Sequence, residues 1–96
     1  MTRVIWKFPI TKMSHRPDTG FVQGEIELPK VYRVLSWQDQ EGTLCMWAEV
    51  LPDAEKTTYK YCLHTTSYEI DHVHGAYQTT VLMHGGKSVI HIYGDS

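Results

Sequence analysis

Residues 43–51, TLCMWAEVL, are the most apolar stretch of the sequence and the best indicator of its fold. Alternate positions divide this stretch into two faces: Leu44/Met46/Ala48/Val50 and Cys45/Trp47/Glu49/Leu51. A bounded apolar run with a period of two residues is typical of a strand rather than a helix. We therefore predict a central β-strand here.

The same two-residue period recurs on both sides of this stretch. We expect further strands at residues 4–8, 21–28, 31–38, 57–64, 76–83 and 87–93. Turn residues separate several of them, most clearly at Gln40–Gly42 and His84–Gly86, because glycine adopts positive φ without steric cost. The spacing predicts one all-β domain over residues 1–96, a small antiparallel sandwich or partly open barrel of about seven strands. Residues 11–20 and 65–75 break the pattern, and we expect them to be loops that carry binding.

Composition limits the classes of function. The 96 residues carry 9 basic and 11 acidic side chains, and no two basic residues are adjacent. General electrostatic binding to nucleic acid is therefore not expected. No run of about 18 apolar residues is present, so no membrane span is expected. Without a signal-like segment, Cys45 and Cys62 are expected to be reduced thiols in a cytoplasm.

Few residues suggest catalysis or metal binding. His72 and His74 form a His-x-His pair beside Asp71, but two imidazoles do not complete a zinc site, and no metal is predicted. Cys45 lies in an apolar strand and is interpreted as core packing rather than a nucleophile. No dinucleotide, phosphate-loop, zinc-protease or serine-hydrolase motif is present. We therefore expect no catalytic residue, no cofactor and no enzymatic activity.

Binding residues are easier to nominate. The hydroxyls of His64–Ser67 and the glycines of His84–Gly86 suit a phosphate group, provided that the two segments lie side by side; ordinary turn chemistry is the alternative. Trp6 and Trp47 are expected in the core. Other aromatic residues near the loops suit stacking on a planar ligand, with an arginine to pair with an anion; a core plus edge residues is again the alternative. The predicted ligand-binding residues are Arg16, Arg33, Trp37, His64, Thr65, Thr66, Tyr68, Tyr77 and His84.

Four segments also resemble a family of short, mostly uncharacterised tailed-bacteriophage proteins. They are Ile5–Ile10, Ile26–Pro29, Leu44–Val50 and His91–Tyr93, which follow the family's layout YKYPL…ELP…LCLWALVDP…TGHP…WHVF. This chain departs from the layout in a longer first loop, and in His64–Ser67 where the family has a Thr-Gly-His-Pro-like turn. The resemblance implies a phage origin and the host cytoplasm as the site of action.

These observations lead to one functional expectation and two alternatives. We expect a phage accessory protein, of the anti-defence kind, that sequesters a small anionic nucleotide-like molecule without catalysis. Because a chain of this size has little room for a deep cavity, a homo-oligomer is expected. The alternatives are a protein-interaction module that inhibits a host defence enzyme through a strand edge or aromatic patch, and a minor virion component.

Overall fold

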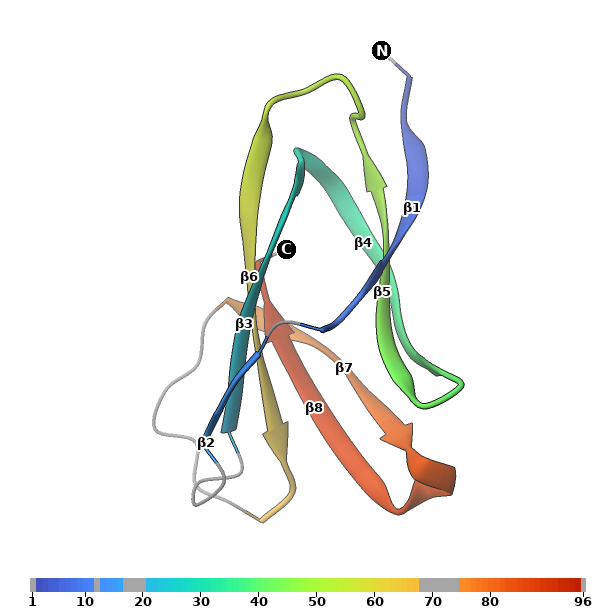
Figure 1. Ribbon diagram of the computed structural model, residues 1–96, viewed down its shortest axis with the longest axis vertical. Helices are drawn as coiled ribbons and strands as arrows, with labels where there is room; N and C mark the ends of the chain where they lie inside the picture. Colours follow the sequence, from blue (N-terminus) through green and yellow to red (C-terminus); the bar gives the residue numbers. More distant parts are fainter. Residues whose placement is uncertain (1, 12, 17–20, 68–74, 96) are drawn as a thin grey trace.

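The fold is an all-β sandwich of two antiparallel sheets. It is seen in a computed structural model, which describes residues 2–11, 13–16, 21–67 and 75–95. These residues contain eight strands in two separate sheets, which do not close into a barrel (Figure 1). The predicted fold class is confirmed.

The small sheet has the strand order β1-β5-β4. Its strands are β1 (Val4–Pro9), β5 (Thr43–Val50) and β4 (Val31–Gln40). The apolar strand β5 lies in the centre, as its composition predicts, and both neighbours are antiparallel to it.

The large sheet has the order β2-β3-β6-β8-β7. Its strands are β2 (Met13–Arg16), β3 (Phe21–Pro29), β6 (Lys56–Thr65), β8 (Ser88–Gly94) and β7 (Ala76–Met83), with the short 3-10 turn η1 (His84–Gly86) between β7 and β8. Strand β2 lies within residues 11–20, which we expected to be a loop. Its sequence, MSHR, is short and has no apolar alternation, so its pairing with β3 rather than its own pattern makes it a strand.

The two sheets are joined at one end and open at the other. Strand β3 leads into β4, and β5 into β6, at the top of Figure 1. The amide of Leu51 donates to the carbonyl of Lys30 at 3.1 Å, which ties these two connections together. The β4–β5 hairpin and the β7–β8 hairpin point the other way, toward the lower end of the view. The segment Ile10–Thr11 crosses between the sheets nearer that lower end.

Alternate residues of both sheets face each other and form the core. The buried members are Ile10, Leu28, Trp37, Leu44, Met46, Ala48, Val50, Tyr59, Tyr61, Leu63, Val81 and Ile92. Cys45 and Cys62 are buried free thiols. The expectation that Trp6 is a core residue is wrong: 41% of it is exposed, and it lies on β1, an edge strand of the small sheet. Trp47 is half-buried, on the side of β5 opposite to Met46 and Ala48.

Candidate functional site

A concave apolar site lies between the two sheets at the open end of the sandwich. This end pocket has a volume of about 370 Å³. Its lining residues are Ile10, Thr11, Val22, Gly42, Thr43, Leu44, Leu63, His64, Thr65, Met83 and Ile90. Small-molecule sites usually measure about 300–1,000 Å³ and are mostly apolar with a few polar groups. The end pocket fits the lower end of that range.

The two-residue alternation of side chains along the strands determines which residues line the pocket. Leu63 and Thr65 are two apart on β6, and their cross-strand partners on β8 are Ile92 and Ile90. Residues two apart in a strand share a face, so this face turns aliphatic side chains and one threonine hydroxyl toward the small sheet. The amide of Ile10 donates to the carbonyl of Leu44 at 2.9 Å, which fixes the crossing segment beside the pocket.

The lining contains no lysine or arginine, but basic residues stand near it. His84 and Lys87 lie in the β7–β8 hairpin, just after the lining residue Met83, and both are exposed. Arg16 is the cross-strand partner of Phe21, which is in turn the partner of His64. The pocket can therefore take an uncharged ring, and the basic positions near its end of the sandwich are accompanied by the exposed acidic Glu41, which directly precedes the lining residue Gly42.

A hydrogen-bonded row crosses the opposite, outer face of the large sheet. His91 Nε2 lies 2.9 Å from Thr66 Oγ1, and His91 Nδ1 lies 3.0 Å from Thr80 Oγ1. Tyr77 Oη lies 2.6 Å from Thr80 Oγ1. In a neutral imidazole one nitrogen donates and the other accepts, so His91 satisfies both threonine hydroxyls at once. These hydrogen bonds hold the side chain of Thr66 in place. Thr66 is the residue directly after Thr65, which lines the pocket.

Aromatic side chains also lie on this outer face of the large sheet. The rings of His64 and Tyr93 meet edge to face at 5.6 Å and 90°, and those of Tyr77 and Tyr93 at 5.6 Å and 70°. The His64 ring is buried, with only 4% of the residue exposed. The structure thus brings His64, Thr66 and Tyr77 to one face, and Thr65 to the other face of the same strand end.

Two predicted ligand residues lie elsewhere. Arg33 is on the outer face of the small sheet, where its Nε donates to Glu49 Oε1 at 2.9 Å, and the Arg3 guanidinium contacts the same carboxylate at 3.2 Å. Trp37 is a core residue, 4% exposed, with ring centroids 6.5 Å from Tyr59 and 5.7 Å from Tyr61. A guanidinium already paired with Glu49, and an indole packed in the core, do not converge with His64 and Thr66.

The predicted phosphate-binding segments meet only in part. His64–Ser67 and His84–Gly86 lie at the same end of the large sheet, with β8 between their strands. Thr65 and Met83 line the end pocket together, whereas Gly85 and Gly86 line a separate shallow hollow beside Trp37. The side chain of Arg16 and the whole of Tyr68 lie outside the described residues.

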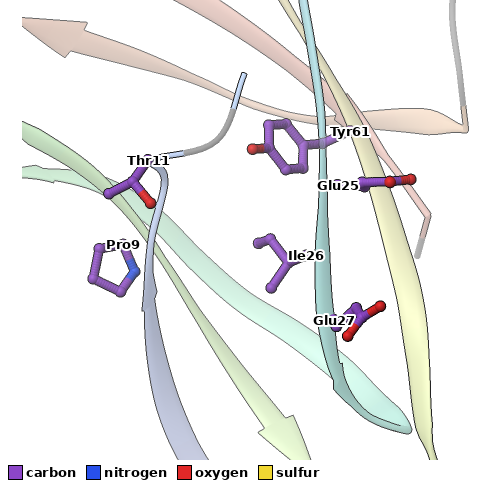
Figure 2. Close-up of a pocket in the computed structure, with 6 residues that line it drawn as sticks. All are labelled: Pro9, Thr11, Glu25, Ile26, Glu27 and Tyr61. Atoms are coloured by element: carbon purple, nitrogen blue, oxygen red, sulfur yellow. The ribbon is translucent and has the colours of Figure 1, made fainter. Parts of the chain in front are cut away.

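A second cavity opens on the side of the sandwich between β1 and β3 (Figure 2). It measures about 400 Å³ and is lined by Pro9, Thr11, Glu25, Ile26, Glu27 and Tyr61. Figure 2 shows the Glu25 and Glu27 carboxylates on the far side of β3, away from Pro9 and Thr11. Burial raises the pKa of the Tyr61 phenol to about 12. This cavity contains none of the predicted ligand residues.

Comparison with known proteins places the chain in a family. Residues 1–96 match the family described as a domain of unknown function, DUF7352. The chain belongs to the DUF7352 family. No curated protein and no solved structure matches it.

The described part of this DUF7352 domain contains neither a cluster of metal ligands nor a membrane-spanning helix. Within residues 2–11, 13–16, 21–67 and 75–95, no three His, Cys, Asp or Glu side chains gather where they could hold a metal ion. The His72 and His74 pair lies outside the described residues. In the same ranges no helix has the length and apolar character needed to span a membrane.

The predicted ligand-binding residues did not include Thr80, His91 and Tyr93, which make the hydrogen bonds and ring contacts of the outer face. Each lies in a predicted strand, and His91 and Tyr93 alternate with the inward residues Ile90 and Ile92. The alternation of the sequence predicts that His91 and Tyr93 share one face of the strand. Their proximity to Thr66 and Tyr77 was not predicted, because it depends on β8 lying between β6 and β7.

Proposed function

We propose that this protein is a non-catalytic binding protein that captures a small anionic molecule of the nucleotide type. The ring of the ligand occupies the end pocket, and its anionic part stays at the mouth near the basic positions. The observation that supports this most directly is the end pocket itself, a concave apolar site of about 370 Å³ that includes His64 and Thr65.

The chemistry of the walls supports a flat, mostly uncharged ring. Val22, Leu44, Leu63 and Ile90 offer aliphatic surface for packing, and Thr65 offers a hydroxyl that orients a ring nitrogen or carbonyl. Because the lining contains no lysine or arginine, a buried charge would be costly there. The charged group of the ligand must therefore remain outside.

Basic residues near the mouth support an anionic group on the ligand, although the exposed Glu41 directly precedes the lining residue Gly42. Arg16 is on the edge strand β2, two strands from β6, and His84 and Lys87 follow Met83 in the hairpin. The hydrogen-bonded row around His91 holds the end of β6 in place, so Thr65 is presented by a rigid strand end. Such preorganisation favours binding because less order must be imposed when the ligand arrives.

The biological setting is part of the same proposal. The resemblance of Leu44–Val50 and the flanking segments to phage proteins supports a phage accessory protein that acts in the host cytoplasm. Capture of a nucleotide signal used in host defence would require tight binding and no turnover, which suits a small β domain with an apolar pocket.

Filling the pocket tests the proposal. In Met83→Trp a bulky indole enters the end pocket, so affinity for the best ligand in a panel of mono-, di- and cyclic nucleotides should fall by about tenfold or more, measured by isothermal titration calorimetry. Leu82→Trp is the matched control, because Leu82 is the preceding residue and points to solvent, 62% exposed. Its affinity should equal that of the wild type.

Two results would count against the proposal in different ways. Full affinity in Met83→Trp would show that the ligand sits elsewhere, whereas a wild-type protein that binds no nucleotide in the panel would refute the ligand class. Thermal unfolding followed by circular dichroism checks that both variants are folded.

A further inference from the structure

The hydrogen-bonded row around His91 has the geometry of an activated hydroxyl. Thr66 Oγ1 lies 2.9 Å from His91 Nε2, and the other ring nitrogen, His91 Nδ1, lies 3.0 Å from Thr80 Oγ1. A hydroxyl becomes a nucleophile when a base lies within about 2.6–3.2 Å of it and a third group orients that base. Thr66, His91 and Thr80 stand in these three positions.

Tyr77 extends the row by one more hydroxyl. Its Oη lies 2.6 Å from Thr80 Oγ1. Because each hydroxyl can donate one hydrogen bond and accept another, a single direction runs through the row. Thr66 donates to Nε2 of His91, Nδ1–H donates to Thr80, and Thr80 donates to Tyr77. In this direction Nε2 is the unprotonated nitrogen and can accept the proton of Thr66.

The order of the strands brings these residues together. Strand β8 lies between β6 and β7, and His91 on β8 is the cross-strand partner of His64 and of Thr80 (Figure 1). Thr66 stands two residues beyond His64, directly after the end of β6. Thr66 is exposed, whereas His91 is half-buried. A reagent can therefore reach the hydroxyl while the sheet holds the base in place.

The backbone beside Thr66 is strained. Ser67 has φ of +79°, in the left-handed region that residues other than glycine rarely adopt. Residues held in such conformations gather at functional sites, where the surrounding structure imposes them. The strained residue thus supports a functional role for this strand end, independently of the hydrogen bonds.

The surroundings favour transfer of an acyl group over transfer of a phosphoryl group. Phosphoryl transfer depends on cations that neutralise charge in the transition state, whereas the row consists of three hydroxyls and one imidazole. The rings of Tyr77 and Tyr93 meet edge to face beside the row at 5.6 Å, and Tyr77 is 55% exposed. These rings offer apolar surface to the leaving group of an activated ester.

We propose that Thr66 accepts an acyl group from an activated ester or thioester, with His91 as the general base. Thr66 Oγ1 bonds to the acyl carbon while its proton passes to His91 Nε2. The bond between the acyl carbon and the leaving oxygen or sulfur then breaks, and the imidazolium gives the proton to the leaving group. The products are an ester on Thr66 and a free alcohol or thiol. One acyl group per chain is transferred without turnover, and the proposal does not depend on the ligand of the end pocket.

Reaction with p-nitrophenyl acetate tests the proposal. Absorbance follows the release of p-nitrophenolate, and mass spectrometry of proteolytic peptides locates the acetyl group. We expect one acetyl group on Thr66 that neutral hydroxylamine removes. This treatment cleaves esters and leaves amides intact, so it separates Thr66 from acetylated lysines.

Two variants of the row and a matched control separate chemistry from structure. General-base assistance contributes about 10²–10⁴-fold, so His91→Gln should slow acetylation of Thr66 by about a hundredfold or more. Thr66→Val should abolish the ester. Thr58→Val is the control, because Thr58 is exposed on the same strand and its partner on β3 is Glu27 rather than a histidine. It should react as the wild type does.

Two results would overturn the proposal. One is acetylation of lysines or the N-terminus with none on Thr66, and the other is an unchanged rate at Thr66 in His91→Gln. Circular dichroism checks that each variant is folded. If His91→Gln does not fold, Thr80→Val provides the same test, since it removes only the group that orients the base. Its rate should fall, and a rate equal to that of the wild type would contradict the proposal.

Discussion

The side chain of Trp37 belongs to the core rather than to a ligand site. Its indole packs against Tyr59 and Tyr61, yet its Nε1 is buried and has no hydrogen-bond partner among the described residues. A buried donor without a partner costs about 1–3 kcal/mol, which offsets part of the gain from burying so large a ring. Sequence reasoning assigned Trp37 to the ligand because Ser36 and Gln38 flank it, but polar neighbours are also what an inward-facing strand residue has.

Trimming Trp37 should therefore destabilise the protein in a graded way. Trp37→Ala should lower the free energy of unfolding by about 3–5 kcal/mol because it leaves a cavity. Trp37→Phe should lose about 1 kcal/mol, because it also removes the unsatisfied donor. Urea unfolding followed by fluorescence of the remaining tryptophans measures both. Equal losses in the two variants would contradict the role given to Nε1.

At the scale of elements, alternation predicted most strands but not their exceptions. The residues of β4 that face the core are Val31, Val34 and Trp37, three apart, because register shifts after Val31 and Val34 reset the alternation. The strand period of two does not give that spacing, so these core positions cannot be read from alternation in the sequence. Strand β2 has no pattern of its own and exists through its pairing with β3.

The start of β7 depends on a glycine. Gly75 has φ of +78°, and a Cβ at this position would collide with the backbone of Gly94 at the end of β8. Gly85 also has positive φ, +69°, but open space around it. An L-residue in the left-handed region costs about 1–2 kcal/mol, so Gly85→Ala should lose about that much.

Gly75→Ala should lose clearly more, because the collision adds to the strain. Chemical unfolding of the two variants side by side measures the difference. If both lose the same free energy, close packing of Gly75 on Gly94 makes no contribution and this description of the β7–β8 contact is wrong.

At the scale of the whole molecule, the sandwich is open and its candidate site lies at the open end. The sequence predicted the all-β class, and of the ligand residues it named, His64 and Thr65 line the end pocket, whereas Thr66 and Tyr77 lie on the outer face of the large sheet. It could not predict the end pocket, because Ile10, Leu44 and Ile90 meet there only through the order of strands in two sheets. For the same reason it placed Arg33 with residues that lie on the other sheet.

The central claim is that the end pocket binds the ligand. A methyl-labelled NMR titration with the nucleotide panel tests it most directly, because Val22, Leu44, Leu63, Met83 and Ile90 each report from the pocket wall. We expect saturable shifts of these methyl signals, while the exposed methyl groups of Ile5 and Leu82 stay unchanged. Saturable shifts confined to residues outside the pocket, or no shift of the wall signals at any ligand concentration, would contradict it.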